Sequence, residues 1–237
     1  MQGSAYPKEH PRQGRQGNRS GCVPSRRQQP LLWTCDGFCV FIVSSILWSN
    51  GGDDRLPDRR CFPYLSGPGP HSLILGSFPG ERSLREGRYY AHPRNAFWSI
   101  MGRLFNAGPE LPYEERLERL SSAGIALWDV LLTCRRTGSM DGSIIEDGAI
   151  PNDLPGFFLE HPTITAIFFN GQKAARLFER LAAPRLGEIS LRMEWKVLPS
   201  TSPAYASKSL EQKVEEWRVL PGAGRPYLDR KSSLRSF

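Results

Sequence analysis

Residues 73–80 read LILGSFPG and residues 89–98 read YYAHPRNAFW, and these two segments decide the fold. The first is a short apolar run that ends in a Gly-x-x-Pro-Gly turn, which is typical of a buried strand leading into a tight loop. In an open α/β sheet, ligands bind at the carboxyl ends of such strands. The second segment is dense in aromatic rings and carries an imidazole, His92, and an amide, Asn95. Together they predict a pocket for a flat polar heterocycle, although glycines that only turn the chain would leave the same pattern.

Outward from these segments, short apolar runs alternate with helical patterns. We expect strands at about 72–76, 125–128, 164–169 and 195–198, and helices at about 96–106, 112–123, 172–181 and 209–220. A polar stretch from Arg135 to Pro155 is expected to be a loop. Strands separated by helices indicate βαβ units and a parallel sheet. The sequence therefore predicts an α/β fold, a three-layer α/β/α domain with four parallel strands, over residues 60–222.

Polar residues follow each expected strand at the point where it ends. They are Ser77, Asp129, Asn170, and Ser200 with Ser202. The carboxyl ends of parallel strands meet at one edge of a sheet, so the pattern predicts that these residues share a single site.

The chain is basic, with 31 Lys and Arg against 24 Asp and Glu in 237 residues. The excess is concentrated before residue 60, so charge gives only weak support for a nucleic-acid partner. Of the five cysteines, none forms a C-x-x-C pair, and only Cys61 and Cys134 lie in the expected domain. This pattern argues against a zinc site or an iron–sulfur cluster, and an odd count fits a reduced compartment. We expect no metal, no cofactor and a cytoplasmic location.

Residues 1–59 form a separate amino-terminal segment. Residues 1–30 have the polar composition of disordered chains. The apolar run at 38–48 resembles a signal peptide or membrane anchor, but it is short for a membrane span. Alternatively, residues 1 to about 55 are not native coding sequence, because an orderly pattern begins only at Arg60. We expect no stable membrane partner, and a flexible tail at 223–237.

Three segments, in this order, resemble the motifs of the uracil-DNA glycosylase superfamily. They are GSFPG at 76–80, YAHPRNAFW at 90–98 and VLPSTS at 197–202. Each is moderately specific alone, and the ordered set is strong. The branches that the chain resembles most are the hypoxanthine-DNA glycosylases and the mismatch-specific uracil or thymine glycosylases. The resemblance implies a three-layer fold and a monomeric, monofunctional DNA glycosylase that removes deaminated bases such as hypoxanthine, uracil or xanthine.

Ser77 departs from the family pattern. Mismatch-specific members carry Asn at this position and other branches carry Asp or Glu, and that group positions or activates the attacking water. A serine hydroxyl is a poor base at neutral pH. The resemblance to the hypoxanthine branch, which is thought to rely on the Asn of its His-Pro-x-Asn segment, therefore assigns catalysis to Asn95. Asn95 could instead cap the helix that begins near Ala96, and both roles could coexist.

The chemistry needs only modest groups, because cleavage of an N-glycosidic bond develops negative charge on the leaving base. Backbone N–H groups of the 76–80 turn and a side-chain amide are suitable donors for that charge. No Lys occupies a motif position, so a Schiff-base step is not implied. His92 could also donate to the leaving base, or be a satisfied loop histidine.

The resemblance also assigns a pocket for the extruded base. Tyr90 would stack on the base, or pack in the core. Asp129 lies where relatives carry a base-reading Asn. Its carboxylate would accept the ring N–H shared by uracil and hypoxanthine and repel the lone pair of cytosine or adenine, or it could cap the next segment. Asn170 would shape its loop or contact the base. The turn around the base would comprise Gly76, Ser77 and Phe78.

Ser83, Ser200 and Ser202 are expected to contact DNA phosphates, unless they are plain turn serines. Residues after Pro203, including Tyr205, lie where relatives insert a wedge into the duplex. One alternative from another class stays open: a catalytically inactive nucleic-acid or nucleotide-binding module on the same fold. Ser77 favours that alternative, and Asn95 with Tyr90 favours the enzyme.

Overall fold

The computed structural model describes residues 34–35, 38–39 and 59–224. The first two pieces, β1 (Thr34–Cys35) and β2 (Phe38–Cys39), pair as a short antiparallel ladder. The predictions for the rest of the amino-terminal segment and for 225–237 lie outside the described residues. In the described part of the chain, no helix has both the length and the apolar content to cross a membrane.

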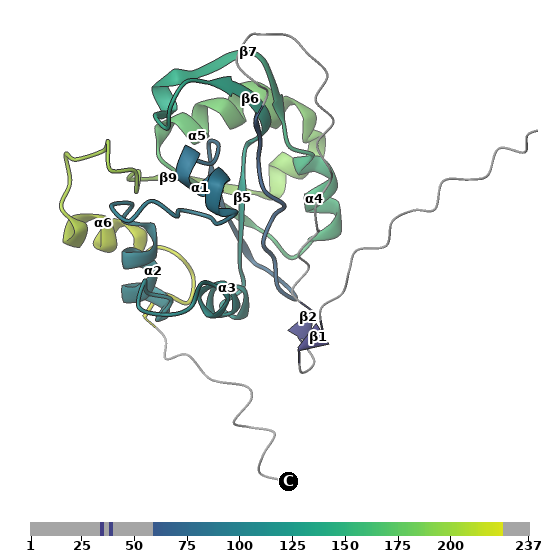
Figure 1. The fold of residues 1–237 in the computed structure, drawn as a ribbon. Helices are drawn as coiled ribbons and strands as arrows, with labels where there is room; N and C mark the ends of the chain where they lie inside the picture. Colours follow the sequence, from purple (N-terminus) through teal and green to yellow (C-terminus); the bar gives the residue numbers. More distant parts are fainter. Residues whose placement is uncertain (1–33, 36–37, 40–58, 225–237) are drawn as a thin grey trace, which may run out of the picture.

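The centre of the fold is a four-stranded parallel sheet in the order β5-β4-β8-β9 (Figure 1). Its strands are β4 (Ser72–Gly76), β5 (Ile125–Asp129), β8 (Ala166–Asn170) and β9 (Glu194–Leu198). The first two are buried along their whole length, which explains why they read as uninterrupted apolar runs. The predicted α/β class with four parallel strands is confirmed.

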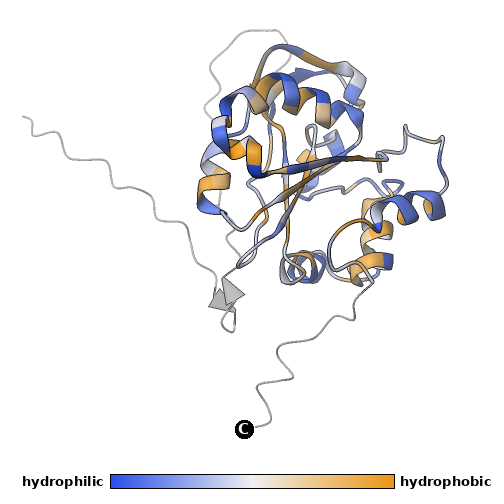
Figure 2. Ribbon diagram, turned by 180° about the vertical axis from the view of Figure 1, so that it is seen from behind, coloured by the Kyte–Doolittle hydropathy of each residue, from blue (hydrophilic) through white to orange (hydrophobic). Residues whose placement is uncertain are grey.

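Helices cover both faces of this sheet and complete three layers (Figure 1). One face packs against α2 (Phe97–Phe105), α3 (Tyr113–Ser122) and α6 (Leu210–Trp217). The other packs against α4 (Leu154–Glu160) and α5 (Gln172–Leu177). Hydrophobic and hydrophilic residues alternate along these helices (Figure 2), as expected for helices with one face on a sheet.

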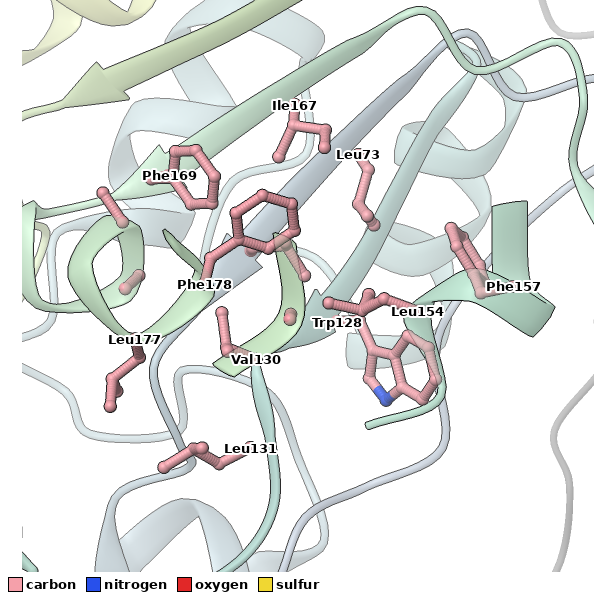
Figure 3. Packing of buried hydrophobic residues seen from close by; sticks show 14 of the residues in the cluster. Leu73, Trp128, Val130, Leu131, Leu154, Phe157, Ile167, Phe169, Leu177 and Phe178 are labelled. Atoms are coloured by element: carbon pink, nitrogen blue, oxygen red, sulfur yellow. The ribbon is translucent and has the colours of Figure 1, made fainter. Parts of the chain in front are cut away.

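Successive residues of β4 point to opposite faces and so join different hydrophobic clusters. Ile74 packs with α2, α3 and α6, whereas Leu73 packs with α4 and α5. Figure 3 shows this second cluster, in which Phe178 faces the strands that carry Leu73 and Phe169. The ring centroids of Phe169 and Phe178 are 5.0 Å apart. The core therefore fixes the strands from both sides and leaves their carboxyl ends free to carry a site.

The predicted loop at 135–155 is wrong. β6 (Leu131–Arg136) and β7 (Ile144–Pro151) form an antiparallel hairpin, which β3 (Arg59–Arg60) extends to a second sheet. Two register shifts interrupt the β6–β7 ladder, and β7 is largely exposed, so no regular alternation marks it in the sequence. The short helix α1 (Glu81–Glu86) was also not predicted.

Candidate active site

A cavity of about 400 Å³ lies at the carboxyl edge of the parallel sheet. Six segments line it: the turn after β4, the segment before α2, the ends of β5 and β8, the loop after β9 and the tip of the β6–β7 hairpin. The cavity brings together ten of the residues singled out from the sequence: Gly76, Ser77, Phe78, Ser83, Tyr90, Asn95, Asp129, Asn170, Ser200 and Ser202. The strand ends thus converge as expected, while the role of each residue stays a prediction.

Asp129 is buried at the end of β5, directly beside Gly76 of β4. A Cβ atom at Gly76 would lie 2.3 Å from Asp129 Oδ1 and 3.3 Å from the hydroxyl of Tyr90. Asp129 Oδ2 is buried and has no hydrogen-bond partner within residues 59–224. Burial, reinforced by the nearby Asp141, raises the pKa of Asp129 to about 7 against the opposing effect of Arg136. The cavity therefore holds a carboxyl group that exchanges a proton near neutral pH.

Tyr90 forms part of the cavity wall and also part of the core. Its ring stacks on Phe97 with centroids 3.9 Å apart and planes 20° apart. Desolvation and the nearby Asp129 raise the pKa of Tyr90 well above its ordinary value, and the Asn170 side chain opposes that shift. The backbone of Tyr90 has a φ of 54°, which is uncommon outside glycine and is held here by the packed ring. Both interpretations of Tyr90, core packing and base stacking, are compatible with this position.

Asn95 lies one residue before Ala96, the N-cap residue of α2, and its side chain reaches the first turn of that helix. Its Oδ1 accepts a hydrogen bond from the backbone N–H of Phe97 at 2.9 Å. The backbone N–H of Asn95 donates a hydrogen bond to the backbone carbonyl of His92 at 2.8 Å. No residue in 59–224 accepts a hydrogen bond from the Asn95 Nδ2 group, which leaves both amide hydrogens for a ligand. Capping thus uses the oxygen of the side chain and spares the donor that catalysis would need.

Asn170 joins the end of β8 to the loop that follows β9. Its Nδ2 donates to Thr201 Oγ1 and its Oδ1 accepts from the Thr201 N–H, each at 2.9 Å. Gly171 follows with a φ of 96°, and a Cβ there would lie 2.9 Å from Ser200 Cβ. The loop-shaping role of Asn170 is therefore visible in its contacts, and its exposure to the cavity is small.

The three serines expected at phosphates each accept a backbone hydrogen bond. Ser83 Oγ accepts from the N–H of Ala91 at 3.2 Å and ties α1 to the segment before α2. Ser200 and Ser202 accept from the N–H groups two residues further along, at 3.2 and 3.3 Å. A hydroxyl that accepts still has its own hydrogen to donate, so these contacts are compatible with phosphate binding.

Three residues at the tip of the β6–β7 hairpin, Ser139, Met140 and Asp141, also line the cavity and were not expected there. The Ser77 hydroxyl donates to Asp141 Oδ1 at 2.6 Å. Ser139 Oγ accepts from the N–H of Glu81 at 3.0 Å, which fixes the tip at a second point. No sequence signal pointed to these residues, because their segment was predicted to be a loop.

Arg136 was also missed and supports the turn after β4 from beneath. It is fully buried, donates a hydrogen bond to the carbonyl of Pro79, and lies 5.3 Å from the ring centroid of Phe78. Desolvation lowers its pKa from the ordinary value, while Asp141 and Asp129 oppose that shift. Arg136 thereby places a positive charge behind the two carboxyl groups.

Two other candidates have contacts of their own. Nδ1 of His92 accepts the backbone N–H of Arg94 at 3.2 Å. Tyr205 does not line the cavity, and Lys213 binds its carbonyl and lies over its ring.

Among the residues that the structure describes, no group of three or more His, Cys, Asp or Glu could hold a metal ion.

Comparison with known proteins gives consistent matches. The sequence model of the uracil DNA glycosylase superfamily matches residues 62–220. A curated relative from Methanosarcina acetivorans, named hypoxanthine DNA glycosylase, is 34% identical over 163 residues, which are 68% of this chain and 97% of the relative. A second of the same name, from Methanosarcina barkeri, is 32% identical over 164 residues, or 67% and 95% of the two chains. The solution NMR structure of a proposed uracil DNA glycosylase from Methanosarcina acetivorans has a TM-score of 0.55 at 34% identity and covers 67% of this chain and 95% of its own.

Proposed function

This chain belongs to the uracil DNA glycosylase superfamily, and we propose that it is a monofunctional DNA glycosylase that hydrolyses the N-glycosidic bond of deaminated bases in DNA. Hypoxanthine is the principal substrate in this proposal, with uracil and xanthine as further ones. The names of the two Methanosarcina relatives support hypoxanthine. The observation that carries the proposal is the meeting of Asn95, Tyr90 and Asp129 in one cavity at the carboxyl edge of the sheet.

The cavity suits a single flipped base. Its volume of about 400 Å³ lies at the lower end of the range for small-molecule sites. A base inside a duplex cannot reach such a cavity, so the target nucleotide has to leave the stack. The ring of Tyr90 lines the cavity and is stacked on Phe97, and it is proposed as the flat surface on which the base stacks. The turn at 76–80 lines the same cavity.

Asp129 is proposed to distinguish deaminated bases from adenine and cytosine. Its unpartnered Oδ2 can accept the ring N–H of a lactam such as hypoxanthine or uracil. Adenine and cytosine carry a lone pair at the corresponding nitrogen, which an ionised carboxylate repels. With a pKa of about 7, the ionised and repelling form of Asp129 becomes dominant above neutral pH. Selectivity for the lactam is therefore expected to improve as the pH rises.

Asn95 is proposed to act on the leaving base. Negative charge grows on the base as the glycosidic bond breaks, and a preorganised amide donor stabilises that charge more than it stabilises the ground state. The capping bond through Oδ1 fixes the orientation of the amide. No Lys lines the cavity among the described residues, which supports hydrolysis by water over a Schiff-base route.

Phosphate contacts would hold the strand in place. The hydroxyls of Ser200 and Ser202 and the side chains of Arg82 and Arg94 lie along the cavity wall. Hydroxyl and backbone donors at such turns bind phosphates without reading sequence, and cations add affinity that depends on salt. This arrangement supports DNA as the partner of the cavity.

The decisive experiment is a single-turnover assay of base release. Oligonucleotides would carry hypoxanthine, uracil, xanthine, adenine or cytosine at one position, in single-stranded and duplex form. We expect release of hypoxanthine and of at least one further deaminated base, with adenine and cytosine left intact. Specific binding of these oligonucleotides without release of any base would instead identify an inactive nucleic-acid-binding module.

A further inference from the structure

Hydrolysis of a glycosidic bond requires a group that takes a proton from the attacking water. Ser77 and Asn95 cannot supply it, because neither a neutral hydroxyl nor an amide is a base at neutral pH. The basic side chains that line the cavity are therefore reduced to His92, Asp129 and Asp141, apart from arginines that stay charged.

The contacts and positions of His92 and Asp129 argue against either residue as the group that takes the proton from water. When His92 Nδ1 accepts the N–H of Arg94, the neutral ring carries its hydrogen on Nε2 and has no second lone pair to offer. Asp129 is buried against Gly76 at the inner end of the cavity, where the base rather than the water would lie. Its raised pKa also makes it a partly protonated group at neutral pH.

Asp141 differs in position and in its contacts. It is only half-buried, and it reaches the cavity from the hairpin tip rather than from a strand of the parallel sheet. The Ser77 hydroxyl donates to its Oδ1 at 2.6 Å, and within the described chain no side-chain or backbone donor binds its Oδ2. The hydrogen bond from Glu81 to Ser139 holds the tip two residues away. The carboxylate is thus anchored through one oxygen and open through the other.

We propose that Asp141 is the catalytic base of the reaction, and that Ser77 is a positioning residue that orients its carboxylate. This inference rests on the proposed glycosylase function. In the step, the water oxygen bonds to C1′ of the sugar while the bond from C1′ to the base nitrogen breaks and its electron pair leaves with the base. One water proton passes to Asp141, which later returns it to solvent, and the released base takes up a proton from solvent.

The test uses Asp141→Ala and Asp141→Asn, with Asp147→Asn as the matched control. Asp147 is an exposed carboxyl on the same hairpin and does not line the cavity. Single-turnover release from a hypoxanthine or uracil oligonucleotide is expected to fall about 10²-fold or more in both Asp141 variants, the usual loss for a general base. The Asp147 variant is expected to retain the wild-type rate, and binding of uncleaved DNA is expected to change less than threefold.

Chemical rescue separates a base from a structural role. Sodium formate, a small carboxylate, is expected to raise the rate of base release by Asp141→Ala at least tenfold, because the truncated side chain leaves room for it. Formate is not expected to restore Asp141→Asn, whose amide fills the space, or Asn95→Ala, whose defect is not a missing base. A structural defect at the hairpin tip would be insensitive to formate.

The outcomes distinguish the inference from the proposed function. Wild-type rates in both Asp141 variants, or low rates without formate rescue, would overturn the role of Asp141 while base release by the wild type still stood. A wild-type chain that releases no base would overturn the proposed function, and the role of Asp141 with it.

Discussion

Gly76 and Asp129 lie so close together that a Cβ atom at position 76 would stand 2.3 Å from the carboxylate oxygen of Asp129. Gly76→Ala is therefore expected to displace Asp129 or Tyr90, to cost about 1–3 kcal/mol of stability and to lower base release at least tenfold. Gly80→Ala is the control, because its Cβ would meet nothing closer than 3.8 Å. Urea unfolding and single-turnover assays measure both effects. Equal rates in the two variants would show that Asp129 can move without loss.

Substitutions of Asn95 and Ser77 are expected to differ clearly in their effect on the rate of base release. Asn95→Asp retains the oxygen that caps α2 and loses the amide hydrogens, so base release is expected to fall about 10²–10³-fold at nearly unchanged thermal stability. Ser77→Ala loses only the orientation of Asp141 and is expected to cost less than tenfold, or about 1.4 kcal/mol. Single-turnover kinetics beside a binding titration measure this. A larger loss in Ser77→Ala would contradict the assignment of Asn95.

Asp129 makes stability depend on pH in an unusual direction for a carboxyl. Its pKa rises from an ordinary 3.8 to about 7 on folding, so the native chain holds a proton that the unfolded chain releases between those values. The native state therefore loses stability as the pH rises from about 4 to about 7, by about 1.4 kcal/mol for each unit of pKa difference. Asp129→Asn is expected to abolish this loss. Urea unfolding at pH 4.5 and pH 8 tests it, and an equal pH slope in both proteins would refute it.

Asn170 and Thr201 are expected to be energetically coupled. Asn170→Ala removes two hydrogen bonds and leaves the buried N–H of Thr201 unsatisfied, which costs about 1–3 kcal/mol. Thr201→Val removes one of the two bonds. A double-mutant cycle in urea is expected to give a coupling energy above about 0.5 kcal/mol. Additive losses would mean that the loop after β9 is held by other contacts.

Met140 is expected to touch the DNA duplex. It lies at the cavity mouth with 62% of its surface exposed, whereas Tyr205 is half-buried and lies outside the cavity. Apolar side chains of this kind enter the gap that a flipped base leaves. Met140→Ala is expected to slow release from duplex DNA at least fivefold and to leave single-stranded substrate unaffected. Leu191→Ala, exposed at 87% and not lining the cavity, is the control. A stronger effect of Tyr205→Ala would restore the wedge position expected from the sequence.

The parallel sheet could be predicted from the sequence because strands that are buried on both faces consist of continuous apolar runs, as in β4 and β5. Parallel strands have their carboxyl ends at one edge of the sheet, so Ser77, Asp129 and Asn170 could be expected there together. The hairpin could not be predicted in this way. β7 is mostly exposed and its pairing with β6 shifts register, so neither a core face nor a regular alternation constrains its residues.

The contacts of individual side chains were also beyond the sequence. The sequence is compatible with both capping and catalysis at Asn95, and the fold shows that the hydrogen bond to α2 uses Oδ1 alone. The alignment of Asp141 with Ser77 depends on a hairpin whose existence had to be known first. Residues that reach a site from a separately folded element leave no spacing pattern near the motifs they complete.

The order β5-β4-β8-β9 has a consequence for the synthesis of the protein. β4 lies between β5 and β8, and its register with β8 joins Ser72 to Ala166, far along the chain. Such long-range parallel pairing forms late and slowly, since a long loop has to close first. A nascent chain that ends before β9 lacks the Ser200 loop and therefore one wall of the cavity. The proposed release of bases would thus require a nascent chain that already includes β9 and the Ser200 loop.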